Sequence, residues 1–386
     1  MHAARRWLLL SFVVLTLPSY AQADSCRLRV SLLTCGPGTD LYSVWGHTAI
    51  RVIDSVAQSD VVFNYGVFDD SDPMFYLKFT RGIMNYVVAP FDFGDFMQEY
   101  QEEKRSVTEQ VLAIDCGEKQ RLQKALWINC QKENRTYPYH FYADNCTTRA
   151  RDILTRNLDK PPAFVPVQPS SASTYRSMIH SYMRSSSQSW NRLSIDLLLG
   201  SHLDETMNTR QAMFLPDYLM KGFDSARIAG KPLVAETNLL LAPVPVETST
   251  VATPILVFSI LLILFTGLAI GGEKTAAALL LADRILFVVT GLLGILLAAL
   301  WIARVDTVCR NNLNLAWALP AHLIAAFALK RRSQFWRYYW IVTAAINMLL
   351  LAGWKWLPQD LNNALIPLVA LLLFRSLHRY LQTSKQ

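Results

Sequence analysis

The sequence lacks the patterns that mark several common kinds of site. Its six cysteines form no CxxC pair and show no metal-ligand spacing, so neither a metal centre nor another cofactor is expected. No internal repeat is present. The small and aliphatic residues of a lipobox do not precede Cys26, so the chain is not expected to be a lipoprotein itself.

A concentrated basic patch is lacking as well. The formal net charge is +7, which at first suggests a nucleic-acid partner. Many of the lysines and arginines, however, flank apolar runs, where they act as topology signals and not as a binding face. We therefore expect no nucleic-acid partner.

The N-terminus has the three parts of a signal peptide. Arg5 and Arg6 supply positive charge, residues 7–17 form an apolar core, and Ala21 and Ala23 give a cleavage site of small residues. The core is too short for a comfortable membrane-spanning helix. Residues 1–23 are therefore predicted to be a cleavable signal peptide.

The long apolar runs lie in the last third of the 386 residues. Most are close to the roughly 20 residues that cross a bilayer core, and the last is the shortest. They predict five transmembrane helices in the region 254–386, at Pro254–Gly271, Arg284–Ile302, Leu313–Leu329, Tyr338–Trp354 and Leu361–Leu373.

Basic residues between these stretches predict their orientation. Lys274, the run at 330–332, and the tail residues Arg375 and Arg379 fall on alternate sides, which the positive-inside rule assigns to the cytoplasm. An exported N-terminus followed by five crossings also puts the C-terminus in the cytoplasm. Both signals predict a multi-pass protein of the bacterial inner membrane with its soluble domain in the periplasm.

The outward loop after the second stretch is rich in polar residues. It contains Asn312 and leads through Pro320 to His322 within the third stretch. Polar groups at membrane depth are costly unless they pair or line a cavity. One helix would suffice as an anchor, so five crossings favour work at the membrane. We therefore take the loop as a candidate wall of a lipid groove, with Asn312 and His322 as candidate substrate contacts.

Residues 24–242 are predicted to form one exported α+β domain, joined to the membrane region by a linker at 243–253. Alternating apolar residues predict strands at 27–34, 48–53 and 61–65. Helical spacing predicts helices at 91–105, 121–129, 147–157, 175–183, 195–199 and 217–226. Because the periplasm is oxidising, Cys26 with Cys35 or Cys116 with Cys130 are candidate disulfides, and the sequence does not fix the connectivity.

Two segments carry the candidate chemistry. The first places His47 at the start of a strand, and the second places Cys146 at the start of a helix. The helix dipole and the free N–H groups of a helix start favour the reactive thiolate. A nearby imidazole can hold the proton and return it. The alternative is an inert cysteine and a core histidine, since free cysteine is among the most buried residue types.

Longer stretches around these residues form a recognisable series. They are Leu32–Gly38, Trp45–Arg51, Phe63–Gly66, Phe75-Tyr76, Arg81-Gly82, Asp144–Arg149, Ile195–Gly200 and Phe214–Pro216. The Cys and His motifs resemble the permuted papain-like thiol enzymes, including the lecithin:retinol acyltransferase group and relatives of the NlpC/P60 peptidases. The whole series resembles the Lnb family of bacterial lipoprotein N-acyltransferases, which pair a periplasmic thiol domain with a C-terminal membrane bundle. The resemblance covers essentially the whole mature chain.

The resemblance implies roles for individual residues. Cys146 would be the nucleophile and His47 the base, with His140 a weaker rival because it lies outside the motif. Either Asn64 or Tyr65 would orient the imidazole. Asn145 would position the thiol or the oxyanion, beside the backbone N–H of Cys146.

Two arginines and two aspartates are considered next. Arg51 and Arg149 are candidate contacts for the phosphate of a donor lipid, with exposed ion pairs as the alternative interpretation. Asp196 and Asp204 match the family pattern but suggest no chemistry, so they are interpreted as structural.

The reaction implied by the resemblance is acyl transfer. Cys146 would take an acyl chain from a membrane phospholipid as a thioester and pass it to the α-amine of the diacylglyceryl-cysteine of a nascent lipoprotein. The alternative function is an NlpC/P60-type peptidoglycan peptidase or amidase anchored in the inner membrane, which would not need five crossings. A third hypothesis is a scaffold with an inactive thiol domain, which the intact Cys/His pair disfavours.

Overall fold

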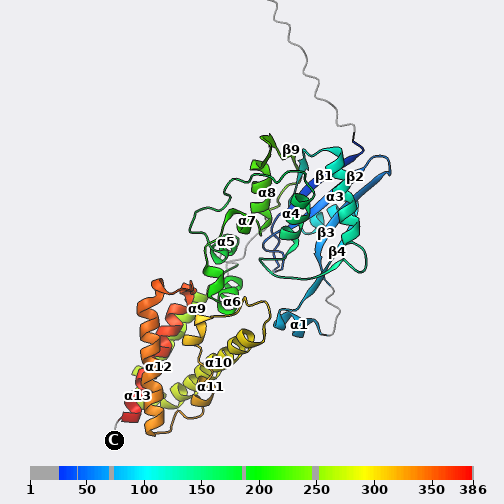
Figure 1. The fold of residues 1–386 in the computed structure, drawn as a ribbon. Helices are drawn as coiled ribbons and strands as arrows, with labels where there is room; N and C mark the ends of the chain where they lie inside the picture. Colours follow the sequence, from blue (N-terminus) through cyan, green and yellow to red (C-terminus); the bar gives the residue numbers. More distant parts are fainter. Residues whose placement is uncertain (1–25, 41, 69–73, 185–187, 246–251, 385–386) are drawn as a thin grey trace, which may run out of the picture.

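A computed structural model describes residues 26–40, 42–68, 74–184, 188–245 and 252–384 of the chain. The predicted signal peptide at 1–23 and residues 246–251 of the predicted linker lie outside this part. Figure 1 shows two regions, a sheet flanked by helices and a group of long helices toward the C-terminus.

The soluble region is built on a seven-stranded sheet whose neighbouring strands all run antiparallel. The strand order is β6-β4-β3-β2-β1-β5-β9. The strands are β1 (Leu28–Cys35), β2 (His47–Asp54), β3 (Ser59–Val67), β4 (Asn85–Asp92), β5 (Val107–Leu112), β6 (Thr136–Pro138) and β9 (Val234–Leu241). A separate hairpin pairs β7 (Arg227–Ile228) with β8 (Lys231–Pro232).

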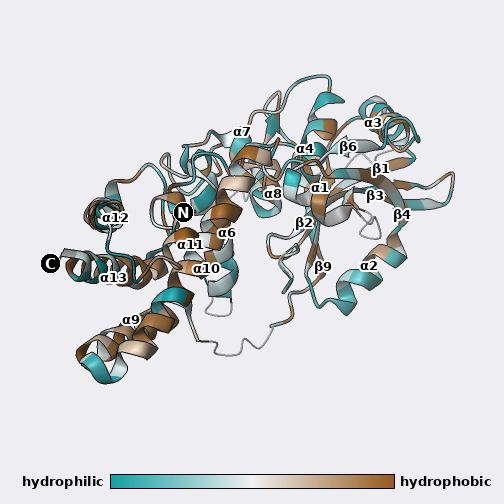
Figure 2. Cartoon of the chain, turned by 90° about the horizontal axis from the view of Figure 1, so that it is seen from below, coloured by the Kyte–Doolittle hydropathy of each residue, from teal (hydrophilic) through white to brown (hydrophobic). Residues whose placement is uncertain are grey.

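Helices lie on both faces of this sheet, and further helices lie between the sheet and the C-terminal region (Figure 1). They are α1 (Phe75–Arg81), α2 (Phe93–Glu102), α3 (Cys116–Asn129), α4 (Cys146–Arg156), α5 (Tyr175–His180), α6 (Ser189–Leu198), the 3₁₀ helix η2 (Ser201–Asp204), α7 (Thr209–Ala212) and α8 (Pro216–Ser225). Helices α3 and α4 lie on one side of the sheet and α2 on the other (Figure 2). The mixed α+β domain predicted from the sequence is therefore confirmed.

Alternation along the strands divides the core into two layers. Val30 and Leu32 of β1 face the layer formed with α3, α4 and α8. Leu33 and Cys35 point to the opposite face, where they pack with Phe96 of α2. Strand β1 is therefore buried on both faces, and its two neighbours β2 and β5 hold it at the centre of the sheet.

The start of α2 differs from the sequence prediction. A helix was expected at 91–105, but residues 85–92 form β4 and the helix begins at Phe93. Asp92 makes the boundary, because its carboxylate accepts a hydrogen bond from the backbone N–H of Gly94 at 2.7 Å.

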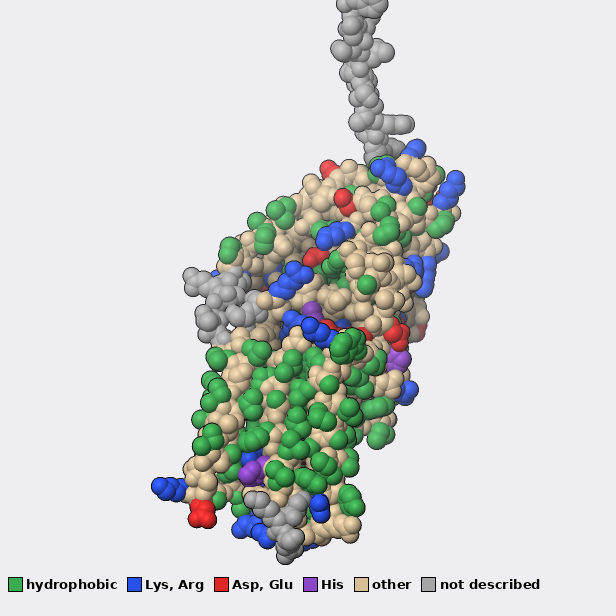
Figure 3. Space-filling model, turned by 90° about the vertical axis from the view of Figure 1, so that its left-hand side faces the viewer, with side chains coloured by type: hydrophobic (Ala, Val, Ile, Leu, Met, Phe, Trp, Pro, Cys, Tyr) green, Lys and Arg blue, Asp and Glu red, His purple; other side chains and the backbone are tan. Residues whose placement is uncertain are grey.

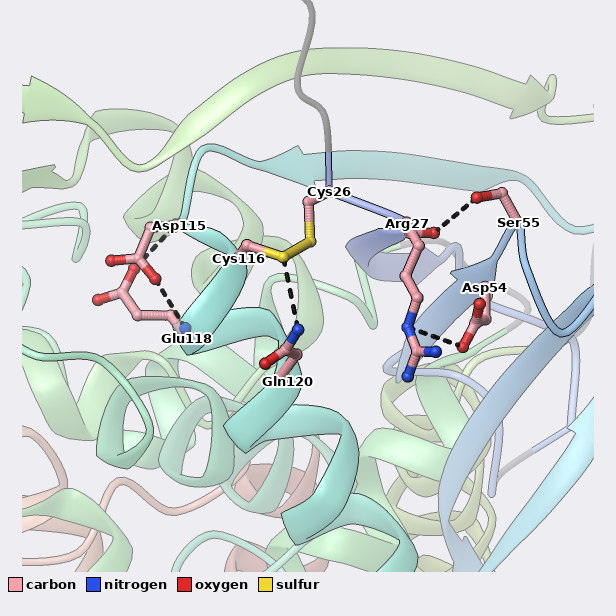
Figure 4. Close-up of a disulfide and its surroundings, with 8 residues drawn as sticks. All are labelled: Cys26, Arg27, Asp54, Ser55, Asp115, Cys116, Glu118 and Gln120. Carbon is pink, nitrogen blue, oxygen red and sulfur yellow. Dashed lines mark hydrogen bonds and ion pairs between the residues drawn. A yellow bond between two sulfur atoms is a disulfide. The ribbon is translucent and has the colours of Figure 1, made fainter.

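The disulfide joins Cys26 to Cys116, whose Cα atoms are 5.4 Å apart (Figure 4). Both suggested pairings are therefore wrong. Cys26 precedes β1 and Cys35 ends it, and at about 3.3 Å per strand residue they lie far beyond the separation of about 7 Å that a disulfide tolerates. Cys116 and Cys130 lie at opposite ends of α3, which separates them in the same way. The start of β1 instead lies near the start of α3.

The C-terminal region contains α9 (Pro254–Ile270), η3 (Gly272–Thr275), α10 (Ala276–Ala303), η4 (Leu313–Ala316), α11 (His322–Ala325), α12 (Gln334–Gly353), η5 (Trp354–Trp356), η6 (Asn363–Leu365) and α13 (Ile366–Ser384). Within the described residues, three helical segments are long and apolar enough to cross a membrane, at Gly272–Ala303, Gln334–Trp356 and Asn363–Thr383, and α9 is a shorter apolar helix. In Figure 2, α9 is coloured as hydrophobic over most of its length, whereas α3 beside the sheet is mixed.

The surface of the C-terminal region is hydrophobic, as its apolar sequence predicts. Figure 3 shows a broad hydrophobic area over the C-terminal helices, with charged side chains gathered above it, where the soluble region begins, and below it at the far end. An apolar surface bounded by charge at both ends is typical of a segment that lies in a bilayer.

The third predicted crossing, Leu313–Leu329, is not a continuous helix. The short helices η4 and α11 are separated by a turn that contains Pro320, which has no N–H to continue a helix. This broken segment packs closely on α10, since a Cβ on Gly294 would lie 2.1 Å from the carbonyl oxygen of Ala318. The described residues therefore do not form five continuous spanning helices.

Two arginines expected in a basic tail lie inside α13 and are buried. Arg375 donates to both carboxylate oxygens of Asp283 on α10, at 2.7 and 2.9 Å, and Arg379 donates to the same carboxylate. These residues join two helices of the C-terminal region, because a buried arginine needs an anionic partner. The sequence suggested only an orientation signal for these arginines, and the structure adds this link between helices.

Candidate active site

His47 is held at the first position of β2 by the glycine before it. Gly46 has a φ of +82°, and a Cβ there would lie 2.5 Å from the carbonyl oxygen of Cys35. Glycine is required at this position because other residues strain in that conformation and would clash. The sharp turn directs the chain into β2, where His47 pairs with Cys35 of β1.

Asn64, on the neighbouring strand β3, fixes the imidazole. The Nε2–H of His47 donates to the Oδ1 of Asn64, 2.5 Å away. Because that oxygen can only accept, Nε2 carries the proton and Nδ1 is the ring nitrogen left to exchange a proton. Asn64 therefore sets both the orientation and the tautomer of the histidine.

Cys146 is the first residue of α4, as the sequence predicted. Asn145 caps the helix: its Oδ1 accepts the N–H of Thr148 at 2.9 Å, and the Thr148 hydroxyl accepts the N–H of Asn145 at 2.8 Å. The cap fixes where the helix begins and leaves the thiol at its positive end. Cys146 is partly exposed, so a reactant can approach it.

The thiol and the imidazole change each other's pKa. Burial raises the pKa of Cys146, but the positive charge and hydrogen bond of His47, with the N–H of Thr48 and the hydroxyl of Thr147, lower it to about 7. Burial lowers the pKa of His47, and the charge and hydrogen bond of Cys146 raise it above its usual value. The pair therefore favours thiolate with imidazolium near neutral pH.

Gly66 is a part of the site to which sequence reasoning assigned no role. It has a φ of +94° at an irregularity of the β3–β4 pairing, between Tyr65 and Val67. A Cβ on Gly66 would lie 3.5 Å from the Cβ of Cys146 and 4.0 Å from the Cε1 of His47. A glycine here lets the helix start and the imidazole approach the end of the strand.

Family comparisons match the two regions of the fold with two separate models. A model of the Lnb N-terminal periplasmic domain matches residues 18–181, and a model of the Lnb transmembrane domain matches residues 246–386. The chain belongs to the Lnb family. Cys146, His47 and Asn64 therefore lie in the part that matches the Lnb periplasmic domain, and α9 to α13 lie in the part that matches the transmembrane domain. No curated protein and no solved structure matches the chain.

Tyr65 and Asn145, two other residues predicted to be catalytic, make hydrogen bonds to other parts of the periplasmic domain. Tyr65 points to the other face of β3, and its hydroxyl accepts a hydrogen bond from Asn129 at 2.9 Å. The side-chain amide of Asn145 donates to the carbonyl oxygens of Phe141 and Phe214, at 2.8 and 3.0 Å. Tyr65 is therefore not the residue that contacts His47, and the Asn145 side chain has no donor left for an oxyanion.

Both arginines predicted to bind a lipid phosphate have protein partners instead. Arg51 donates two hydrogen bonds to Asp60, at 2.8 and 2.6 Å, and one to Glu109 at 3.1 Å. Arg149 donates two to Asp144, at 2.6 and 2.7 Å. A guanidinium held by two parallel bonds is already neutralised, so these contacts match the ion-pair interpretation.

The two predicted contacts in the Lnb transmembrane domain are buried and paired as well. Asn312 donates to the carbonyl oxygen of Leu197 at 2.7 Å, and His322 has Tyr339 Oη 2.6 Å from Nδ1. The other ring nitrogen of His322 lies 3.0 Å from the carbonyl oxygen of Trp317. Both side chains hold the fold of the loop together.

His140, the rival histidine, lies at the boundary of the two Lnb domains. Its Nε2 is 3.1 Å from the carbonyl oxygen of Asp306, in the loop that follows α10. The turn from His140 to Asp144 leads directly into α4. This contact puts the start of α4, and with it Cys146, at the end of the soluble domain that faces the membrane helices.

A network centred on Asp196, here called the junction network, links the two domains. Asp196 is fully buried; one oxygen lies 3.0 Å from Nη1 of Arg176 and 2.7 Å from Nε2 of His180, and the other accepts a bond from Asn362 at 2.9 Å. Further members that tie α5, α6 and η2 to the loops of the transmembrane domain are Asp204, Asn312, Asn314 and Gln359. The structural interpretation of Asp196 and Asp204 thus has a physical basis.

One carboxylate cluster among the described residues has the spacing of a metal site, but its contacts explain it. Asp115, Glu118 and Asp159 lie at the start of α3. The two oxygens of Glu118 accept the N–H groups of Asp115 and Asp159, at 3.0 and 2.9 Å. The cluster therefore acts as a helix cap.

Proposed function

We propose that this Lnb-family protein is a lipoprotein N-acyltransferase of the bacterial inner membrane. Cys146 is the nucleophile, His47 the general base and Asn64 the residue that orients the base. The donor is a membrane phospholipid, and the acceptor is the α-amine of a lipoprotein diacylglyceryl-cysteine. The observation that supports this most is a helix-start thiol paired with an imidazole whose second nitrogen is bound by Asn64.

The first half-reaction forms a thioester. The Cys146 thiolate attacks the carbonyl carbon of a phospholipid acyl ester, and a tetrahedral intermediate forms. As it collapses, the ester C–O bond breaks, and the imidazolium of His47 gives its Nδ1 proton to the departing alcohol. A lysophospholipid leaves, and the acyl chain remains on sulfur.

The second half-reaction moves the acyl chain to nitrogen. The α-amine attacks the thioester carbonyl while the neutral His47 takes one of its protons. The C–N bond forms, the C–S bond breaks, and the thiolate is restored beside the imidazolium. Because a thioester is activated toward amines, a thiol nucleophile suits an amide-forming transfer.

Both half-reactions put negative charge on the carbonyl oxygen. The backbone N–H of Cys146, at the first position of α4, is a natural donor to that oxygen because the first N–H groups of a helix have no intrahelical partner. Asn145 contributes by fixing the start of the helix, since its side-chain donors are engaged by Phe141 and Phe214.

The relation of the two domains supports lipid substrates. The turn before Cys146 contacts Asp306 just after α10, and the backbone N–H of Val305 donates to the carbonyl oxygen of Arg81 at 3.0 Å. A site at this end of the domain is suited to substrates that reside in the bilayer. We propose the organisation as a signal peptide at 1–23, a periplasmic papain-like thiol domain at 24–242, a linker at 243–253 and a multi-pass membrane region at 254–386 with a cytoplasmic C-terminus.

The test is to complement a bacterial strain that lacks lipoprotein N-acylation with the full-length protein. Mass spectrometry of lipoprotein N-termini should find the third acyl chain with the wild type, and a free α-amine with Cys146→Ala and Cys146→Ser. Serine is expected to fail because its hydroxyl is barely ionised near neutral pH. Triacylated lipoproteins made by Cys146→Ala would overturn the proposal. Altered peptidoglycan fragments with unchanged lipoproteins would favour the peptidase.

A further inference from the structure

Tyr137, on the edge strand β6, buries a hydroxyl group that has no partner. The residue is 2% exposed, and its Oη makes no hydrogen bond within the part of the chain that the structure describes. An unsatisfied buried hydroxyl costs about 1–3 kcal/mol. A polar group kept in this state calls for a physical explanation.

The hydroxyl lies beside the reacting groups. A Cβ on Gly66 would be 4.0 Å from the Tyr137 Oη, 3.5 Å from the Cβ of Cys146 and 4.0 Å from the Cε1 of His47. The thiol-bearing residue, the imidazole and the phenol therefore converge on one glycine. No side chain at Gly66 occupies the point between them.

Two contacts hold the ring in this position. Tyr137 pairs with Tyr86 across the β4–β6 ladder, and the guanidinium carbon of Arg149 lies 3.7 Å from the centre of the Tyr137 ring. Asp144 in turn fixes Arg149 through its two hydrogen bonds. A cation over the ring face is attracted to the aromatic electrons, so the ring is held where its hydroxyl faces the site.

The Tyr137 hydroxyl is protonated, and so a donor, near the pH at which Cys146 ionises. Burial raises the pKa of Tyr137, and the negative charge of Cys146 raises it further, against the opposing effect of Arg149. A protonated phenol can donate to an oxygen that becomes negative, whereas a phenolate would repel it.

We propose that the Tyr137 hydroxyl donates a hydrogen bond to the carbonyl oxygen of the acyl group as that oxygen gains negative charge. This inference rests on the proposed acyl transfer. Tyr137 acts together with the backbone N–H of Cys146, so the oxyanion has two donors from different elements. Arg149 is then a positioning residue for the Tyr137 ring, which gives it a role other than contact with a phosphate.

The first experiment measures transfer by the full-length protein in mixed micelles, with phosphatidylethanolamine as donor and a synthetic diacylglyceryl-cysteine peptide as acceptor. Tyr137→Phe should lower kcat by about tenfold to 1,000-fold, the effect of losing one oxyanion donor, with little change in KM. The matched control is Tyr65→Phe, whose hydroxyl is bound to Asn129. It should transfer within about twofold of the wild type, because that hydroxyl is already bonded to Asn129 and phenylalanine keeps the ring that packs against Tyr137.

A second readout separates an oxyanion donor from a structural tyrosine. Hexadecanal should inhibit by adding to the thiol: the S–C bond forms, and the thiol proton ends on the former carbonyl oxygen. That oxygen occupies the oxyanion position, so Tyr137→Phe should weaken inhibition about tenfold, as expected for one lost hydrogen bond. Alkylation of Cys146 by iodoacetamide, which needs no oxyanion, should be unchanged.

A third variant tests the positioning role. Arg149→Lys keeps the charge but loses the two parallel bonds to Asp144. It should lower kcat by less than Tyr137→Phe does, because the ring is loosened while the hydroxyl is kept. Melting temperatures check that both variants are folded; phenylalanine retains the ring and its contact with Arg149.

The outcomes distinguish this inference from the proposed function. A wild type that forms no N-acyl product contradicts the proposed function itself. A wild type that transfers, together with a Tyr137→Phe variant of equal kcat and equal aldehyde inhibition, overturns the oxyanion role. A Tyr137→Phe variant that is slow in both transfer and alkylation also overturns it, because a general distortion of the site then explains the loss.

Discussion

The thiol site and the junction network treat buried polar groups in opposite ways. At the junction, all three guanidinium nitrogens of Arg176 donate, and the Asp196 carboxylate binds three different side chains. At the thiol site, the Tyr137 hydroxyl has no partner within the described residues, and Cys146 is partly exposed. The first arrangement fixes the two domains against each other, and the second keeps groups available to a reactant.

The junction network therefore provides rigidity, whereas the thiol site provides reactive groups. A fully satisfied buried network rigidifies a structure and is costly to break. A site with an unpaired donor can form a hydrogen bond that is made only when negative charge develops on the substrate. Variants at the junction should therefore change stability and access to lipid, whereas variants at the thiol site should change the chemistry alone.

The largest expected effect is the loss of the base. His47→Ala should lower acyl transfer by about 10²- to 10⁴-fold, the usual contribution of a general base. His140→Ala is the matched control and should retain most of the activity, since His140 binds the backbone of Asp306 and not the thiol. Transfer assays on both proteins check this. An inactive His140→Ala beside an active His47→Ala would show that the base was assigned to the wrong histidine.

Breaking the junction network should destabilise the protein without touching the thiol. Asp196→Ala leaves the Arg176 guanidinium buried and without one of its two carboxylates, which costs about 3–5 kcal/mol for a buried pair. The melting temperature in detergent should fall, and transfer from vesicles should drop. Alkylation of Cys146 in the folded fraction should be unchanged. Alkylation that falls in proportion to transfer would contradict the separation of the two regions.

Loss of the Asn64 amide should lower the rate of transfer less than loss of His47 does. Asn64→Ala removes a hydrogen bond to an imidazole that becomes charged, worth about 1.5–3 kcal/mol, or roughly tenfold to 100-fold in rate. The melting temperature should change little, because the pair is partly exposed. Tyr65→Phe serves as the neighbouring control on the same strand. A greater loss from Tyr65→Phe than from Asn64→Ala would reverse the assignment of the orienting residue.

The pH dependence of alkylation reports the coupling between thiol and imidazole. In the wild type, the rate should rise as the pH passes through about 7, the lowered pKa of Cys146. In His47→Ala the lowering charge is gone and burial remains, so the midpoint should move to higher pH. Rates of iodoacetamide modification over a pH series measure the shift. Identical profiles for the two proteins would mean that His47 does not set the thiolate.

The smallest effect on transfer is expected for Arg51, whose guanidinium is already paired with two carboxylates. Arg51→Gln should change transfer by less than about threefold, since the Arg51 guanidinium is already neutralised by Asp60 and Glu109. Its Michaelis constant for phospholipid should be unchanged. A strong rise in that constant would restore Arg51 as a lipid contact.

The sequence predicted the residues whose environment is local. Cys146 and His47 each open an element, and the cap at Asn145 is visible in the neighbouring residues. The choice between Asn64 and Tyr65 was not predictable, because adjacent residues of a strand face opposite ways and the local pattern does not say which side chain meets the imidazole. Tyr137 left no signal at all, since its role depends on Gly66 and on a helix that follows later in the chain.

The sequence did not predict the partners of several polar groups or the path of one apolar stretch. The two bonds from Arg149 to Asp144 match the ion-pair alternative, whereas the sequence did not point to Tyr339 as the partner of His322. The third apolar stretch has the length of a spanning helix, yet Pro320 and the glycines of α10 give it a broken path. Hydrophobicity indicates that a segment is buried in lipid or protein, and the tertiary contacts decide its shape.

The central claim is that Cys146 carries the acyl chain during transfer. The most direct measurement is the mass of the intact protein, and then of its peptides, after incubation with phosphatidylethanolamine and no acceptor. The account predicts one acyl adduct on Cys146 that hydroxylamine removes and that disappears when the diacylglyceryl-cysteine peptide is added. An N-acyl product formed while the adduct is absent, or is found on another residue, would contradict it.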